Sequence, residues 1–126
     1  MSQNKHFTAS DNMDWTTINW EAYTVTAPTG YTILENQCRI NRSLKLFIVS
    51  LRLDIPDSGT GSTYAESLPE PSGGVSMPLF ARVEGGTLVN QNPGVWKRAV
   101  GGSIGSASRS KTEVSSIQIG GIYPIK

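Results

Sequence analysis

Residues 44–53 read Leu44-Lys45-Leu46-Phe47-Ile48-Val49-Ser50-Leu51-Arg52-Leu53, and this run decides the fold class of the chain. Successive side chains of a β-strand point to opposite faces of its sheet, so Leu44, Leu46 and Ile48 share one face. Phe47 lies on the other face, and the pattern changes phase beyond Val49, where later leucines join that face. Either a bulge re-aims the strand or two layers bury both of its faces, and we expect the second.

A hairpin is expected just before this run. The segment Gln37-Cys38-Arg39-Ile40 is joined to it by Asn41-Arg42-Ser43, a polar tripeptide suited to a tight turn. Elsewhere, short β-rich runs alternate with clusters of Gly, Pro, Asn and Ser, without an uninterrupted helical repeat. Further strands are expected at residues 23–25, 31–34, 64–66, 77–83, 87–90, 95–100, 103–105 and 114–119. This pattern predicts an all-β fold, an antiparallel β-sandwich or jelly-roll-like domain of about 8–10 short strands.

The length, charge and cysteine count of the chain disfavour several classes of protein. It has 126 residues, enough for one domain, and a formal net charge of +1, which favours neither nucleic acid nor an anionic membrane. Cys38 is the one cysteine and His6 the one histidine, so we expect neither a disulfide framework nor a zinc site, and no cofactor. The apolar run 46–49 is far shorter than the roughly 20 residues that cross a bilayer. No apolar signal region follows the first residues, so we expect no secretion signal and no membrane insertion.

The two ends of the chain differ in what they can bury. Residues 1–12 have little to bury besides Phe7, and we expect a flexible N-terminal arm or a strand lent to another subunit. Residues 13–126 are then the β-sandwich domain. The end Gly120-Gly121-Ile122-Tyr123-Pro124-Ile125 is apolar, so we expect it to dock against the body or a neighbouring subunit.

The sequence offers little support for a set of catalytic side chains, and we expect that the chain is not an enzyme. Nucleophilic catalysis needs a base, and His6 lies in the expected arm. The Gly-rich segment 101–105 lacks the lysine of a phosphate-binding loop. Carboxylates are available for glycoside cleavage, but nothing in their spacing brings two of them across a cleft: Asp54, Asp57, Glu66, Glu70 and Glu84.

One segment combines the residue types that bind sugars. Asn90-Gln91-Asn92-Pro93-Gly94-Val95-Trp96-Lys97-Arg98 holds a ring, amides and a guanidinium group together. Sugars stack their apolar faces on rings while their hydroxyls accept and donate hydrogen bonds. The alternative is that Trp96 belongs to the core and the amides form a turn. For a saccharide site we expect rings as stacking platforms and polar groups as hydroxyl readers, at Trp96, Arg98, Asn92 and Tyr64.

The order of several motifs resembles a known family. Trp15-Thr-Thr-Ile-Asn-Trp20 comes first, and Asn36-Gln-Cys-Arg-Ile-Asn41 then leads into the long apolar strand. Leu68-Pro69 follows a Gly/Ser loop, and Gly121-Ile-Tyr-Pro-Ile125 closes the chain. In this order the chain resembles, over about residues 15–125, the C-terminal head (receptor-binding) domain of phage tail-fibre and baseplate proteins of Gram-positive-infecting phages.

The resemblance implies a virion protein at the tail tip or baseplate, made in the bacterial host cytoplasm. Such a head domain is a homotrimer that contacts other tail and baseplate proteins and attaches to host cell-wall polysaccharide without cleaving it. Strands that are apolar on both faces give a physical motive for the association of copies. Three alternatives remain: a structural baseplate or tail-assembly module that contacts only phage proteins, a small glycan depolymerase, and a cellular carbohydrate-binding module.

Overall fold

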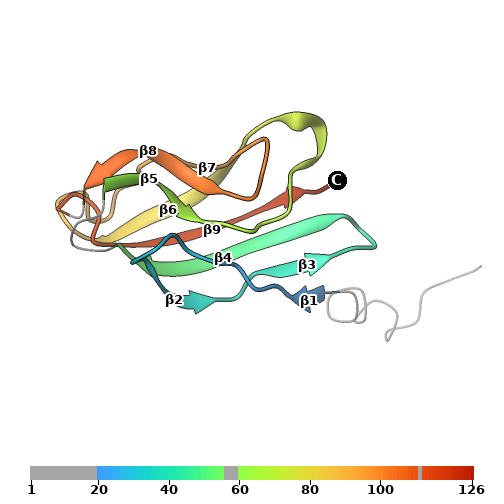
Figure 1. Cartoon of the computed structure of the whole chain (residues 1–126), viewed down its shortest axis with the longest axis horizontal. Helices are drawn as coiled ribbons and strands as arrows, with labels where there is room; N and C mark the ends of the chain where they lie inside the picture. The colour runs from blue at the N-terminus through green and yellow to red at the C-terminus, as the bar shows by residue number, and fades with distance from the viewer. Residues whose placement is uncertain (1–19, 56–59, 111) are drawn as a thin grey trace, which may run out of the picture.

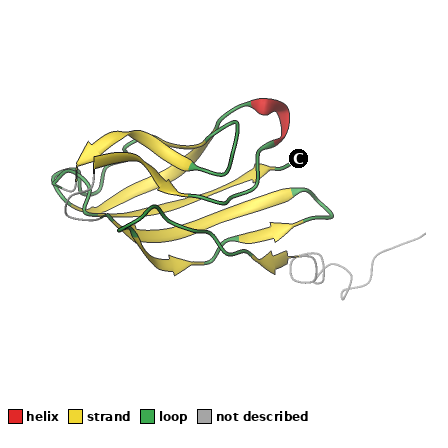
Figure 2. Cartoon of the chain, viewed as in Figure 1, coloured by secondary structure: helices red, strands yellow, loops and turns green. Residues whose placement is uncertain are grey.

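The computed structural model describes residues 20–55, 60–110 and 112–126, and this part of the chain forms an antiparallel sheet of nine strands. The expected all-β fold is therefore confirmed, and the expected arm at residues 1–12 lies outside the described residues. Within the described residues there is one 3-10 turn, η1 (Ser72–Gly74) (Figure 2). The strands are β1 (Trp20–Ala22), β2 (Thr32–Asn36), β3 (Arg39–Asn41), β4 (Leu46–Asp54), β5 (Thr60–Ala65), β6 (Met77–Gly85), β7 (Val95–Lys97), β8 (Ile104–Ser110) and β9 (Ser116–Pro124).

The strands follow the order β1-β3-β4-β9-β6-β7-β8-β5, and β2 pairs with β4. Strand β6 belongs to both arms of the sheet, because Met77 to Leu79 pair with β7 whereas Phe80 and the residues after it pair with β9. The sheet curls into a half-barrel, with β5, β8 and β7 on one side and β1 to β4 on the other (Figure 1). The two sandwich-like layers are therefore parts of one continuous sheet.

Buried and half-buried residues alternate regularly along the whole length of strand β4. Its residues pair without interruption with β9, from Leu46 opposite Pro124 to Asp54 opposite Ser116. Phe47 and every second residue after it are buried, whereas the intervening residues are half-buried. The expectation of a bulge or of two fully buried faces is therefore wrong: the apolar residues beyond Val49 keep the phase of Phe47. The other face of β4 is apolar at one end and is left partly open.

The core lies between the two arms of the curled sheet. Phe47 of β4 is fully buried and meets Tyr23 edge-on at a centroid distance of 5.0 Å, and Tyr123 of β9 at 5.5 Å. From the other arm, Tyr64 and Ile104 join the same cluster. Aromatic and β-branched side chains fill this space well, since pleated strands present them at regular intervals.

The local predictions have mixed outcomes. The hairpin is confirmed, with β3 and β4 joined by a turn in which the Asn41 side chain accepts a hydrogen bond from the Leu44 amide at 2.9 Å. The apolar C-terminus docks on the body as β9, and Ile125 is buried. Residues 87–90 form a turn rather than the expected strand, because the Val89 and Gln91 amides bond within the loop. Residues 23–25 are not a strand either, although Thr26, just after them, bridges to Glu66 across the open side of the half-barrel.

A buried lysine anchors the turn between β7 and β8. The Lys97 ammonium donates to the carbonyl oxygens of Arg98 at 2.9 Å and Gly101 at 2.7 Å, and its burial lowers its pKa. Glu70, from the β5–β6 loop, accepts from the Gly101 amide at 2.8 Å and pairs with the Lys126 ammonium at 2.9 Å. These contacts tie three segments together, so β7 and the residues it presents are held in place.

Candidate functional site

The outer face of the curled sheet carries the candidate site. Strands β4, β9 and β6 lie side by side here, and their outward residues stand in two rows across the strands. The rows are Ser50, Gly120 and Phe80, followed by Arg52, Gln118 and Arg82. Cross-strand neighbours on one face are close enough to act together, because adjacent strands are only about 4.8 Å apart.

A groove with a volume of about 280 Å³ opens in this face. The Phe80 ring stands at its side with 82% of its surface exposed. Gly120, directly opposite on β9, has no side chain, and Arg82 and Gln118 line the groove at its charged end. A Cβ at Gly120 would lie 3.7 Å from the nearest atom, the Val49 carbonyl oxygen, so packing does not require a glycine there. The missing side chain leaves the groove open beside the ring.

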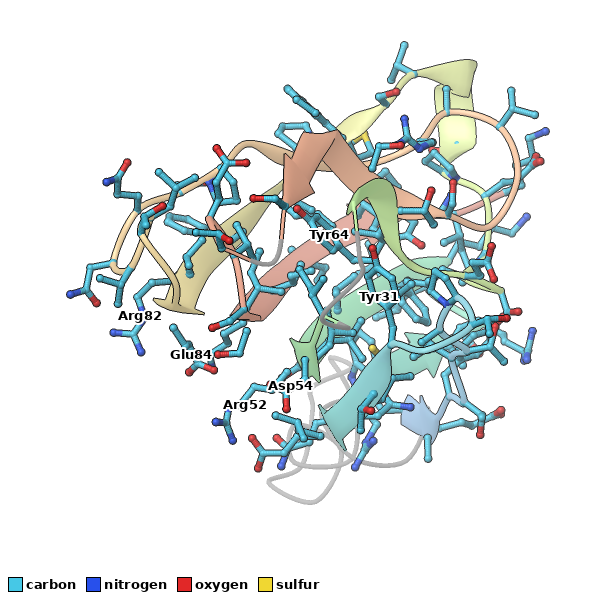
Figure 3. The ribbon with its side chains drawn as sticks, turned by 60° about the vertical axis from the view of Figure 1, so that its left-hand side comes forward. Tyr31, Arg52, Asp54, Tyr64, Arg82 and Glu84 are labelled. Carbon is cyan, nitrogen blue, oxygen red and sulfur yellow. The ribbon has the colours of Figure 1, made fainter. Side chains whose placement is uncertain are left out.

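A four-member charge network borders the groove. Arg52 donates to Glu35 and to Glu84, each at 3.1 Å, and these hydrogen bonds raise the pKa of Arg52. The second guanidinium group, that of Arg82, lies 3.7 Å from the other oxygen of Glu84. Figure 3 shows Arg52, Arg82 and Glu84 on the outside of the sheet, with Asp54 near them. The network holds two positive and two negative side chains, so their charges cancel.

Residues 91–94 run along the other edge of β6. The Val83 amide donates to the Gln91 carbonyl oxygen at 3.0 Å. Val95 pairs with Leu79, so the step from Val83 back to Leu79 on β6 matches the step from Gln91 forward to Val95. Between these two points Asn92 and Gly94 therefore pass beside the groove-lining part of β6. The Asn92 side chain accepts from the Gly94 amide at 2.9 Å, so it forms the expected turn and is also exposed.

Trp96 is on the same outer face as Phe80. Its neighbours on β7, Val95 and Lys97, are buried, whereas Trp96 points outward with 46% of its surface exposed. It stands opposite Pro78, two residues before Phe80 on β6. Its ring reaches back over Gly94, where an added Cβ would lie 3.6 Å from the ring edge. The structure thus places Trp96 and Asn92 beside β6, on the side away from β9, and neither lines the groove.

The other two expected site residues lie apart from the groove. Arg98 crosses over Gly105 and donates to the Ser62 carbonyl oxygen at 2.9 Å, which fixes its guanidinium group on β5. Tyr64 is fully buried between the arms, as Figure 3 shows, and its hydroxyl lies 2.9 Å from that of Ser106. A buried ring cannot stack on a ligand at the surface, so the expectation for Tyr64 is wrong in this structure.

None of the residues that line the groove was anticipated as a site residue from the sequence, including Phe80, Arg82 and Gln118. The signal for them was the alternation in Met77-Pro78-Leu79-Phe80-Ala81-Arg82-Val83, in which Leu79, Ala81 and Val83 are buried. Period-two alternation puts Phe80 on the polar face with Arg82, where a large exposed ring is unusual. Gln118 follows from the same pattern in β9.

The described residues contain no group of three side chains suited to a metal ion, and no helix within those ranges is long and apolar enough to span a bilayer. Asp54 and Glu84 stand on strands separated by β9, and two arginines hold the Glu84 carboxylate. A ring, an amide and guanidinium groups around an open groove suit the binding of a polar ligand with an apolar face. No protein-family model, curated protein or solved structure matches the chain.

Proposed function

We propose that this chain is a non-enzymatic receptor-binding module that attaches a phage tail or baseplate to a saccharide on the host cell surface. The observation that carries the proposal is the Phe80 ring, exposed beside a groove that Gly120 leaves open and that Arg82 and Gln118 line. A sugar ring offers one apolar face for stacking and a rim of hydroxyls for forked hydrogen bonds. The order of the sequence motifs supplies the phage context.

Binding rather than cleavage is favoured by the state of the carboxylates. Glycoside cleavage needs one carboxyl group as a proton donor and a second as nucleophile or base. No carboxyl group is among the described residues that line the groove, and Glu84 at its border is already paired with Arg52 at 3.1 Å and with Arg82 at 3.7 Å.

Association into homotrimers is part of the proposal. The end of the outer face away from the charge network is aliphatic, with Leu46 and Ile48 half-buried on β4 and Ile122, opposite Ile48, 55% exposed on β9. Leu44 in the adjoining turn is also exposed. A second copy that covers this patch would remove apolar surface from water, and several weak sugar sites on one particle would gain effective concentration.

The test is binding to isolated cell walls of a panel of Gram-positive bacteria. Phe80→Ala should weaken binding about tenfold, as expected for the loss of a central aromatic anchor. Gly120→Val should block the groove, while Val100→Ala, at another exposed apolar residue in the β7–β8 turn, should bind like the wild type. Thermal melting of each variant verifies that it is folded.

Three outcomes would overturn the proposal. If Phe80→Ala and Gly120→Val bind walls as well as the wild type, the groove is not the site. If the wild type binds no wall but binds other tail proteins, the chain is a structural module. If new reducing ends appear on the wall glycan, the chain is a depolymerase.

A further inference from the structure

Two aromatic platforms, rather than one, face outward beside the groove. Phe80 and Trp96 lie on adjacent strands and are diagonal neighbours, since Trp96 stands opposite Pro78. Diagonal neighbours in an antiparallel pair are about 7–8 Å apart. Pro78, opposite Trp96 and two residues before Phe80, is exposed as well. Neither ring stacks on another ring among the described residues, and Phe80 is 82% and Trp96 46% exposed.

The row continues beyond Phe80 in the other direction. Gly120 and then Ser50 lie opposite Phe80 on β9 and β4 and line the same groove. With adjacent strands about 4.8 Å apart, the distance from Phe80 to Ser50 is about 10 Å across the strands. Added to the diagonal step to Trp96, this row is longer than a single sugar ring, so it suits a chain of sugars that crosses the strands.

The charges around the row are balanced and already paired. Glu84 lies against both guanidinium groups, and Glu35 holds the far side of Arg52. An anionic ligand at Arg82 would compete with Glu84 and be repelled by it, a cost that discriminates against such ligands. The remaining polar side chains at the row are neutral: Ser50 and Gln118, which line the groove, and Asn92, which is exposed in the loop beside β6.

We propose that the row from Ser50 to Trp96 binds an uncharged saccharide chain of two or more sugar units, lying across strands β4, β9, β6 and β7. This inference rests on the proposed function and names its ligand class. Phe80 and Trp96 stack on successive sugar units, while the side chains of Gln118, Asn92 and Arg82 bind their hydroxyls. A wall polymer that carries phosphate on each repeat is excluded by Glu84.

The experiment uses isolated Gram-positive cell walls before and after hydrofluoric acid treatment, which cleaves phosphodiester bonds, together with the dephosphorylated glycan that the treatment releases. The wild type should bind either the treated walls or the released glycan as well as it binds untreated walls. Its binding should change less than about twofold between about 50 mM and about 500 mM sodium chloride, because no charge pairs form with the ligand. Trp96→Ala and Phe80→Ala should each lose about tenfold. Oligosaccharides released from the treated walls should compete better than the single sugars they contain.

Glu84→Gln supplies the matched test of the charge argument. This variant keeps the size of the side chain and leaves Arg82 without its carboxylate partner. It should bind untreated, phosphate-bearing walls more tightly than the wild type does, and that added binding should disappear at high salt.

The outcomes separate the ligand class from the function. If Phe80→Ala loses binding but the wild type binds in a salt-dependent way, and neither the treated walls nor the dephosphorylated glycan that they release is bound, the site is a saccharide site for an anionic polymer and this inference is wrong. If single sugars compete as well as longer fragments, or Trp96→Ala has no effect, the multi-unit row is wrong. If Phe80→Ala binds cell walls as tightly as the wild type does, the proposed function itself is overturned.

Discussion

Gly105 is the position where the structure makes its sharpest stability prediction. It lies on β8 beneath the Arg98 side chain, which crosses it to reach the Ser62 carbonyl oxygen on β5. A methyl group at Gly105 would overlap both that oxygen and the Arg98 Nη2 atom, and it would lie 3.0 Å from the Ser62 carbonyl carbon. Since one obstacle is backbone, Gly105→Ala has to push β5 away from β8.

The cost combines two effects. Overpacking against backbone costs about 1–3 kcal/mol. Displacing the Arg98 guanidinium group removes a charge-assisted hydrogen bond of 2.9 Å, worth about 1.5 kcal/mol or more. We therefore expect Gly105→Ala to lower the free energy of unfolding by about 3 kcal/mol, which for a domain of this size is roughly a 12 °C fall in Tm.

Urea unfolding followed by tryptophan fluorescence measures this loss, and Gly120→Ala is the matched control. Gly120 is also in a strand, but its added Cβ would make only an ordinary contact of 3.7 Å. The control should stay within about 0.5 kcal/mol of the wild type, or gain stability, because alanine restricts the unfolded chain more than glycine does. If Gly105→Ala is as stable as the wild type, or the two variants lose equal stability, the packing of Arg98 over β8 is wrong.

Three further predictions concern the buried Phe47 ring, the contacts of Glu70 with Gly101 and Lys126, and the aliphatic patch around Ile122. Phe47→Ala should cost about 3–5 kcal/mol in urea unfolding, because it empties a fully buried ring site; a loss below about 1 kcal/mol would contradict that packing. The hydrogen bond from the Gly101 amide, and then Lys126, lowers the pKa of Glu70 from its usual value of 4.5. The ionised Glu70 therefore stabilises the folded protein fully above pH 4.5, and this stabilisation is lost as the pH falls through the lowered pKa of the folded state. Glu70→Gln should therefore flatten the acid limb of Tm against pH, and an unchanged limb would rule this out. Ile122→Asp should convert trimers to monomers in sedimentation velocity, and a wild type that is already monomeric at micromolar concentration would refute the proposed association.

The fold was predictable where side chains alternate and turns are marked by their residues. The hairpin into β4 and the docking of β9 follow from polar turn residues and from apolar alternation. The run 87–90 was mistaken for a strand because Leu88 and Val89 favour strands, but the loop closes on itself between Gly86 and Gln91. Short apolar runs do not reveal whether a partner strand is within reach.

The site was predictable in part, for a related reason. A ring beside amides marked Trp96 and Asn92, which are exposed on the β7 side of Phe80 although neither lines the groove. Tyr64 was placed wrongly because the glycine- and serine-rich strand around it shows no alternation that would tell its inner from its outer face. The Arg98 side chain, just after β7, passes over Gly105 of β8 to reach the Ser62 carbonyl oxygen on β5, and this contact depends on strand register and not on local sequence.

The continuous sheet is what allows the aromatic row to exist. In a sandwich of two separate sheets the outer faces point in opposite directions, so outward residues of the two layers cannot share a ligand. Here β6 pairs with β7 through its first residues and with β9 through its later ones, so both layers share one outer surface. Trp96 of one arm and Gly120 of the other therefore flank Phe80 on the same face.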